Sequence, residues 1–436
     1  MPELMPFRGW RYAPALDLLS VTAPPYDVLS DAEVAAYAAR DARNIVHVDV
    51  PPHTAEGYAG AAATLRAWMA DGVLVRDVAP TLTLYRQHFT DETGAARSVI
   101  GVLGGLPVVD YRSSVEQAPD PSSCRRQDPV GSVAARPQSL GNSRDPAPGG
   151  ITTAASTVLP HENVTPKAST DRLDLTRATN ANLSPVWGLS LASGLAGLLQ
   201  RTWDAAVAAG AVPAGLEEAG VTHETLPIAD AGAIDAINAL LGPADVLIAD
   251  GHHRYGVAQK YRDEAGTPAA RHTLAFVGEL VDDQLSVEAI HRLYDGVSFH
   301  ALCAALATSF DLAPAPRPTQ STLAEMVATG RLVLLAPDGS AAWLTPKPGA
   351  FDGVRALDGA WLEHALAGVP GLQVSYQHGL AEVLGAVSSH AGAVLIRPTS
   401  IAEIRRTATE GLLMPPKSTF FTPKLRTGLV LRTMDE

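Results

Sequence analysis

Residues 246–262 constrain the fold of this chain more than any other stretch. They begin with four apolar residues, Val-Leu-Ile-Ala, which predict a short buried strand, and Asp250-Gly251 end that strand. An amphipathic helix is predicted to begin directly after the glycine. A strand that turns at a glycine into a helix directs several backbone N–H groups, and the positive end of the helix dipole, to one point. The turn is therefore predicted to bind an anion.

Polar side chains gather in the same turn, because His252, His253 and Arg254 directly follow Asp250 and Gly251. This cluster is more specific than a glycine-rich loop alone, but its residue types do not define a reaction. Two adjacent histidines at the start of a helix point in different directions, unlike a pair spaced four residues apart. A chelated metal ion is therefore disfavoured, and we predict no metal site.

Length and composition describe a globular protein with a sizeable core. The 436 residues allow two or three domains of roughly 100–200 residues each, and 46% of them are apolar. A net charge of −13 argues against a general nucleic-acid-binding surface. The two cysteines, Cys124 and Cys303, suggest neither a disulfide framework nor a metal cage. No apolar run approaches the roughly 18 residues that span a bilayer, so we expect a soluble, cytoplasmic protein.

Alternating helix and strand patterns predict an α/β protein with a mixed or parallel sheet. Residues 82–89 and 97–103 are predicted to form a hairpin, and residues 44–50 a strand. Residues 112–157 are rich in Pro, Ser, Arg, Gln and Gly, which predicts disorder or an artefact of the gene model. We expect five parts: an N-terminal α/β part (1–111), the insertion (112–157), a core with the Asp-Gly-His-His-Arg turn (158–298), a second α/β lobe (299–390), and a strand, helix and loop that return to the core (391–436).

Four further segments carry side chains suited to chemistry or ligand binding. They are Tyr26-Asp27 in a loop held extended by prolines, His161-Glu162 with Lys167, His291-Arg292, and Lys417-Ser418-Thr419 after Pro-Pro. A glutamate beside a histidine and a lysine can serve as general base, proton shuttle and phosphate clamp. Each segment also has a structural explanation, as a packed rigid loop, a solvated charged loop or an internal salt bridge. The last segment lacks the glycine-rich run of a P-loop, so Walker-type binding is not supported.

Taken together, these strings resemble the bacterial and archaeal domain of unknown function 1015 family. The resemblance runs from the first residues to the last, with several motifs in fixed order. Residues 112–157 depart from the family pattern, which passes quickly from the strand near Val109 to the Leu-Pro-His-Glu loop. The motifs that carry the resemblance are Pro6–Arg8, Ala23–Val28, Leu159–Glu162, Thr165–Lys167, Asp250–Tyr255, His291–Leu293 and Met414–Thr419.

The Asp-Gly-His-His-Arg turn is also similar to the nucleotide-binding turn of ParB-like and sulfiredoxin-like domains, a group that includes free-serine kinases. This resemblance implies a ParB/sulfiredoxin-like core with additional α/β elements. It also implies transfer of the γ-phosphoryl group of ATP, or the β-phosphoryl group of ADP, to the hydroxyl of free L-serine. Mg²⁺ is expected with the nucleotide. The implied partners are a nucleotide and a small-molecule substrate, without membrane or nucleic acid, and a homo-oligomer is compatible with the sequence.

The resemblance implies roles for individual residues. A catalytic base is expected among Asp250, Glu162 and His253. Phosphates would be bound by Gly251, His252, Arg254, Lys167, Lys417, Ser418 and Thr419. The substrate would be bound by Tyr26, Asp27, His161, His291 and Arg292.

Two other functions remain open from the sequence. The first is a nucleotide-binding switch or partition-type module without turnover. The second is a metal-dependent hydrolase that uses His252, His253, Asp250 and His161.

Overall fold

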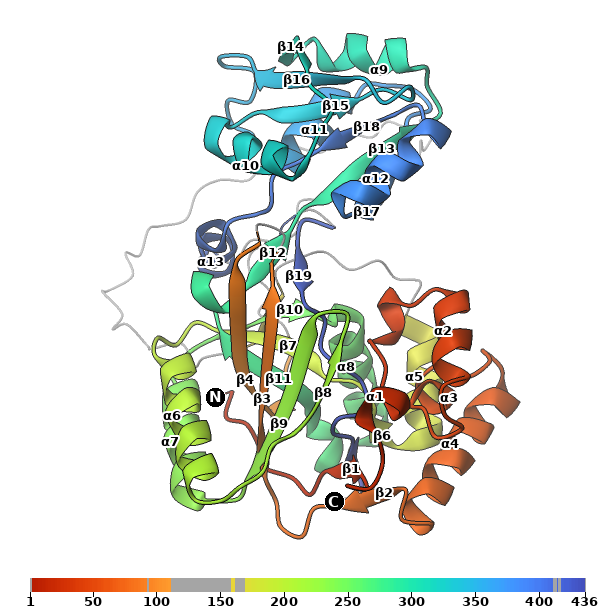
Figure 1. Ribbon diagram of the computed structural model, residues 1–436, viewed down its shortest axis with the longest axis vertical. Coiled ribbons are helices and arrows are strands. Elements are labelled where there is room, and N and C mark those ends of the chain that lie inside the picture. Colours follow the sequence, from red (N-terminus) through yellow and green to blue (C-terminus); the bar gives the residue numbers. More distant parts are fainter. Residues whose placement is uncertain are drawn as a thin grey trace, which may run out of the picture.

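The computed structural model describes residues 2–91, 94–110, 158–160, 169–410, 414 and 417–435. The chain forms a larger lobe and a smaller lobe, one above the other in Figure 1. Residues 112–157, which include Cys124, were predicted to be disordered and lie outside the described residues. Within the described residues, no helix has the length and apolarity needed to cross a membrane.

The larger lobe is built on an eight-stranded sheet. Strand β10 runs parallel to β5 and antiparallel to β7, while β11 runs parallel to β7 and antiparallel to β4. The sheet is therefore mixed, and the predicted mixed α/β class is confirmed. Its order is β5 (Val158–Pro160), β10 (Val246–Asp250), β7 (Val186–Ser190), β11 (His272–Glu279), β4 (Ala96–Pro107), β3 (Leu82–Thr90), β9 (Val221–Ile228) and β8 (Ala214–Glu218).

Side-chain alternation on β10 explains why both faces of this sheet are covered. Val246 and Ile248 enter one hydrophobic core cluster, and Leu247 and Ala249 enter another, so the strand is buried on both sides. Figure 1 shows α6 and α7 along one flank of the sheet, and α1 to α5 with α8 along the other. These helices are α1 (Leu18–Val21), α2 (Asp31–Ala38), α3 (Val46–Asp49), α4 (Ala55–Ala70), α5 (Ser169–Thr179), α6 (Leu195–Ala208), α7 (Ala231–Leu241) and α8 (His252–Ala265).

The smaller lobe is built on a six-stranded sheet. Its strands, in order, are β14 (Phe310–Ala315), β16 (Ala341–Pro346), β15 (Leu332–Leu335), β18 (Gly392–Leu395), β13 (Ile290–Asp295) and β17 (Gln373–His378). Its helices are α9 (Phe299–Leu306), α10 (Gln320–Thr329), α11 (Asp358–Leu366) and α12 (Leu380–Ala386).

The end of the chain returns to the larger lobe. Helix α13 (Ile401–Thr409) leads to β19 (Phe420–Thr422), which pairs with β12 (Ser286–Glu288) in a ribbon between the two large sheets. Beyond it, β20 (Arg432–Thr433) pairs with β6 (Ala181–Asn182). Leu431 bridges Trp10, next to the small sheet of β1 (Trp10–Tyr12) and β2 (Leu74–Arg76). Segments far apart in the sequence therefore meet around the larger sheet.

Two local predictions were wrong. Residues 44–50 do not form a strand, because Val46–Asp49 form α3. The Asn44 side chain accepts a hydrogen bond from the Val46 amide at 3.1 Å and donates to the Ser20 carbonyl oxygen at 2.7 Å, which favours a turn over an extended chain. The loop expected to be extended at Tyr26-Asp27 is one 3₁₀ turn, Tyr26–Val28, after Pro25.

Candidate functional site

The corner between β10 and α8 is shaped by a glycine. Gly251 has a φ of 81°, a left-handed conformation that strains other residues, and a Cβ atom there would lie 2.9 Å from Arg254 Nε. Gly251 has no side chain to cap α8, whose first hydrogen bond is donated by the Tyr255 amide to the Gly251 carbonyl oxygen at 2.9 Å. The amides of residues 252–254 therefore face the corner, where the helix dipole is positive.

Asp250 ends the strand and is held by two cations. Its Oδ1 accepts a hydrogen bond from Lys424 Nζ at 2.9 Å, and its Oδ2 accepts one from Arg254 Nη2 at 2.7 Å. Burial raises the pKa of this carboxyl group, but Lys424 and Arg254 outweigh burial and hold the pKa well below its usual range. Asp250 is therefore ionised at physiological pH, with partners on both oxygens.

Arg254 joins this corner to the N-terminal loop. Its Nη2 also donates to Asp27 Oδ2 at 3.2 Å, and its Nη1 donates to the carbonyl oxygen of Pro185. The side chain is 9% exposed, and its Nε–H has no acceptor among the described residues. Burial lowers the pKa of the guanidinium group, but Asp27 and Asp250 outweigh burial and the net shift is upward. Arg254 is thus a buried cation with one unused donor.

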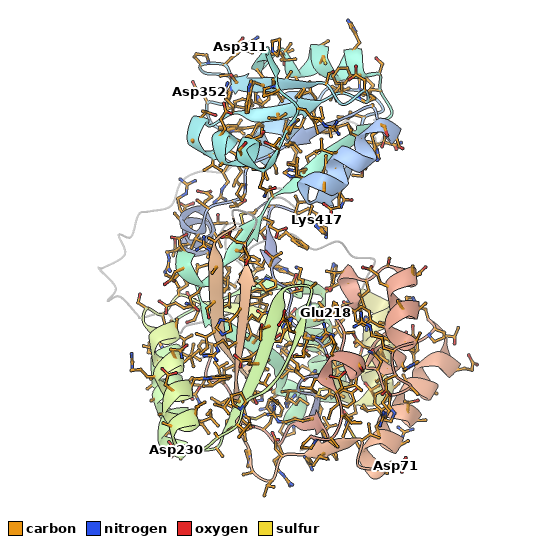
Figure 2. All side chains as sticks on the ribbon, viewed as in Figure 1. Asp71, Glu218, Asp230, Asp311, Asp352 and Lys417 are labelled. Carbon is orange, nitrogen blue, oxygen red and sulfur yellow. The ribbon has the colours of Figure 1, made fainter. Side chains whose placement is uncertain are left out.

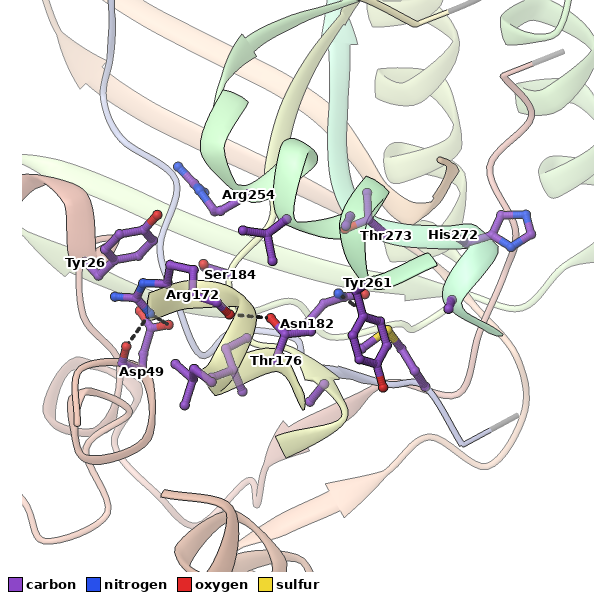
Figure 3. A pocket seen from close by; sticks show the side chains of 17 residues that line it. Tyr26, Asp49, Arg172, Thr176, Asn182, Ser184, Arg254, Tyr261, His272 and Thr273 are labelled. Atoms are coloured by element: carbon purple, nitrogen blue, oxygen red, sulfur yellow. Dashed lines mark hydrogen bonds and ion pairs between the residues drawn. The ribbon is translucent and has the colours of Figure 1, made fainter. Parts of the chain in front are cut away.

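A second arginine lies beside the first (Figure 3). Arg172 donates to a side-chain oxygen of Asp49 at 3.2 Å, and its guanidinium carbon lies 3.2 Å from the centre of the Tyr26 ring. Burial raises the pKa of Tyr26 to about 12. Burial also raises the pKa of Asp49, against the opposing effect of Arg172. Tyr26 therefore stays neutral and forms a stacked layer with Arg172 next to Arg254.

Charged groups from three segments of the chain affect the pKa of His253. Burial lowers its pKa, Asp27 opposes that shift, and Lys417 and Arg254 add to it. The imidazole is therefore neutral at neutral pH, and its buried Nδ1 has no hydrogen-bond partner among the described residues. Figure 2 places Lys417 between the two lobes, in a left-handed backbone conformation with a φ of 60°. Lys417 thus brings a cation from the C-terminal segment toward the corner.

His291 and Arg292 lie on β13 of the smaller sheet and are buried. His291 Nδ1 accepts from the Ile396 amide at 3.2 Å, and burial lowers its pKa to about 4. Arg292 donates to the Lys417 carbonyl oxygen at 3.1 Å and lies 4.6 Å from the centre of the Tyr376 ring. The predicted anion-binding pair is therefore engaged with backbone groups and an aromatic ring, next to the Lys417 turn.

The structure brings some of the predicted site residues together and leaves others apart. Asp27, Asp250 and Arg254 form one ion-pair cluster. Ser418 and Thr419 are buried, and the Ser418 carbonyl oxygen accepts from Thr399 Oγ1 at 3.0 Å. The residues beside the cluster are Tyr26, Gly251, His252 and His253. The predicted residues His161, Glu162 and Lys167 lie outside the described residues.

Sequence reasoning missed Lys424, Arg172 and Asp49. Lys424 also lies over the Phe420 ring, with Nζ 4.1 Å from its centre. It follows a Thr-Pro pair, as Lys167 does, and that repeat was the available signal. Asp49 sits in the apolar run 45–50, and a buried carboxylate in such a run requires a cationic partner.

A small cavity lies next to the corner, between α5 and α8 (Figure 3). Its volume is about 50 Å³. One end is lined by Tyr26, Asp49, Arg172 and Arg254, and the other by Tyr261, His272 and Met434. In the cavity and throughout the described part of the chain, no group of three or more His, Cys, Asp or Glu side chains is arranged to hold a metal ion.

Several solved structures show a distant similarity to this chain. A free serine kinase in complex with ADP is similar over 61% of this chain and 84% of that chain, at 12% identity and a TM-score of 0.33. A conserved hypothetical protein from Pyrococcus furiosus matches 61% of this chain and 87% of its own, at 9% identity and a TM-score of 0.33. SbnI from Staphylococcus aureus, with a C-terminal truncation, matches 62% and 81%, at 11% identity and a TM-score of 0.31. None of the curated proteins matches.

A family model covers most of the chain. Residues 4–115 and 152–360 match the model described as "Protein of unknown function (DUF1015)", and the match spans the β10–α8 corner and the Tyr26 loop. The family resemblance predicted from the sequence is therefore confirmed, and the motif Met414–Thr419 lies beyond the matched residues. This chain belongs to the DUF1015 family.

Proposed function

We propose that this chain is a small-molecule kinase that transfers the γ-phosphoryl group of ATP, or the β-phosphoryl group of ADP, to the hydroxyl of free L-serine. The observation that carries the proposal is the β10–α8 corner, where the positive end of the α8 dipole and the buried Arg254 lie together beside Asp27 and Asp250. Phosphoryl transfer depends mainly on positioned donors and positive charge, so such a site requires no covalent nucleophile.

The corner suits the phosphates of a nucleotide. Gly251 lets the Arg254 guanidinium group lie close against the backbone of the corner. Arg254, Lys417 and Lys424 bring three cations to the corner, beside the carboxylates Asp27, Asp250 and Asp49, and the helix dipole adds to the positive field. We propose that Arg254, Lys417 and the amides of residues 252–254 hold the phosphates, with Lys167, Ser418 and Thr419 as further contacts.

ATP or ADP would supply the phosphoryl group, and Mg²⁺ would neutralise part of its charge. Asp27 is the carboxylate that we assign to the hydrated ion, because its side chain is 32% exposed and makes one long bond, 3.2 Å, to Arg254. Asp250 is less suitable, since both of its oxygens already have cationic partners. The same occupancy disfavours the hydrolase alternative, which would need Asp250 as a metal ligand.

We assign proton transfer to His253. Asp250 is a weak base because its pKa is depressed, so we assign it the role of fixing the corner. The His253 imidazole is neutral, so it can accept a proton. In the reaction, the bond between the transferred phosphorus and the nucleotide's bridging oxygen breaks, and a bond from phosphorus to the serine hydroxyl oxygen forms. The hydroxyl proton passes to His253, with Glu162 as the alternative acceptor.

The test is direct assay of O-phosphoserine. Purified protein is incubated with L-serine, Mg²⁺ and ATP or ADP, and the product is measured by mass spectrometry. Arg254→Lys keeps the charge but loses the forked contacts to Asp27 and Asp250, so kcat/KM should fall by about 100-fold or more. Arg262→Ala, on the same helix, is the control, because Arg262 bonds Asp110 away from the corner.

The outcomes separate the candidate functions. O-phosphoserine from the wild type and from Arg262→Ala, with strong loss in Arg254→Lys, supports the kinase. Nucleotide binding without transfer to any acceptor would instead support a switch module. Absence of product with both donors would overturn the proposal.

A further inference from the structure

The cavity between α5 and α8 is sized for a small molecule. About 50 Å³ accommodates roughly three to five water molecules, at about 10–15 Å³ for each. A small amino acid displaces a comparable volume of water, whereas a nucleotide is several times larger. The cavity therefore cannot be the nucleotide pocket, and a ligand that fills it is a small one.

Two buried arginines contribute to its walls. Arg172 and Arg254 both line the cavity, both are at least nine-tenths buried, and the Nε–H of each has no acceptor among the described residues. Asp171 Oδ2 lies 3.9 Å from Arg172 Nε, beyond hydrogen-bond distance. A carboxylate is the group that two guanidinium donors bind best.

The same end of the cavity also has an acceptor for a cation. Among the described residues that line it, Asp49 is the one that carries a carboxylate. Arg172 occupies Oδ1 of that carboxylate at 3.2 Å. Two arginines and one carboxylate therefore lie at the same end of the cavity. Their charges match those of an α-amino acid, whose carboxylate and ammonium groups are both attached to the Cα atom.

Arg254 connects the cavity with the corner. The residue lines the cavity, and it also bonds Asp250 at the end of β10. A molecule held in the cavity therefore lies next to the group that we assign to the nucleotide phosphates. That adjacency is what a phosphoryl acceptor requires.

We propose that the α5–α8 cavity is the acceptor site, and that it binds a small α-amino acid such as L-serine. The carboxylate of the amino acid lies toward the guanidinium groups of Arg172 and Arg254, and its ammonium group lies toward Asp49. This inference rests on the proposed kinase function for the identity of the acceptor. It assigns acceptor binding to Arg172 and Asp49 rather than to His291 and Arg292.

The chain offers a matched pair of variants on α5. Thr176 and Thr179 each donate a hydrogen bond from Oγ1 to the carbonyl oxygen four residues earlier, at 2.8 Å, and each is partly buried. Only Thr176 is among the residues that line the cavity. Thr176→Leu places a longer apolar side chain in the cavity, whereas Thr179→Leu makes the same change one turn away.

The experiment is isothermal titration of both full-length variants and the wild type with L-serine and, separately, with ATP and Mg²⁺. L-Serine affinity should fall at least tenfold in Thr176→Leu and stay within twofold of wild type in Thr179→Leu. ATP affinity should be unchanged in both. Thermal unfolding checks that the variants are folded, and Arg172→Lys replaces Thr176→Leu if that variant is not.

Unchanged serine affinity in a folded Thr176→Leu protein would overturn the assignment of the cavity and leave the kinase proposal standing. If the wild type binds L-serine in the cavity but transfers no phosphoryl group, the kinase proposal fails while the binding site stands. L-Phenylalanine, which is too large for the cavity, should give no heat, and binding as tight as that of L-serine would also count against the site.

Discussion

Replacing Lys424 by methionine should destabilise the protein by about 3 kcal/mol. Lys424 Nζ bonds Asp250 at 2.9 Å, and their side chains are 13% and 24% exposed. Removing one member of a buried ion pair costs about 3–5 kcal/mol, because the other charge stays buried. The lower end applies here, since Asp250 keeps Arg254 as a partner. Methionine retains most of the stem that packs on Phe420 but loses the cation–π contact, worth about 0.5–2 kcal/mol.

Urea unfolding followed by tryptophan fluorescence measures this loss. Trp187 reports on the relevant core, because it is buried and its ring packs against Phe421. The control is Lys347→Met, in which the lysine is 36% exposed and lies 4.0 Å from the exposed Asp311. Such a surface pair is worth at most about 1 kcal/mol. If Lys424→Met costs no more than Lys347→Met, Lys424 does not hold the corner and the reasoning is refuted.

The same variant has a pH signature. Because the pKa of Asp250 is depressed in the folded protein, its stabilising effect is present above the ordinary carboxyl pKa of about 4 and is lost as the pH falls below it. Lys424→Met removes one cause of that depression. The difference in unfolding free energy between the wild type and Lys424→Met should therefore shrink below about pH 4. A constant difference down to acid unfolding would contradict this account.

Two other predictions concern single residues. Gly251→Ala should lose about 1–3 kcal/mol of stability, because a residue with a Cβ is strained at the positive φ and would contact Arg254. The same variant should bind ATP more weakly in calorimetry. The control is Gly256→Ala, which should stabilise α8 by up to about 1 kcal/mol, because no atom lies within 4 Å of the added Cβ. Burial lowers the pKa of His223 to about 4, so stability should fall as the pH drops from about 6.5 to 4, by up to roughly 3 kcal/mol. His223→Gln should flatten that slope in pH-dependent urea unfolding. Equal slopes in the wild type and in His223→Gln would contradict the prediction.

The local part of the site could be predicted from the sequence. The apolar run of β10, the glycine that ends it and the polar start of α8 are neighbours in the chain, so one window contains the whole corner. Residues 44–50 show where such reasoning fails. Their alternation suits a strand, but Asn44 bonds the carbonyl oxygen of Ser20, and that contact with a distant loop favours the helical turn.

The partners of the corner could not be predicted in the same way. Lys424 is 174 residues from Asp250, and Asp27 is 227 residues from Arg254. The sequence around Asp250 does not indicate which cation pairs with it, because the pairing depends on how β19 returns to β12. The cavity is likewise formed by α5, α8 and the C-terminal segment together, and no single segment shows it.

The return of the C-terminal segment has a consequence for biosynthesis. A ribosome adds roughly 5–20 residues per second, so Lys424 is made roughly 10–35 s after Asp250, the residue 174 positions before it. The whole six-stranded sheet is synthesised in that interval. During it, the nascent chain carries the Asp250 carboxylate without the lysine that later neutralises it. The corner can reach its final charge balance only after the smaller lobe has been synthesised, so assembly of the site is a late step.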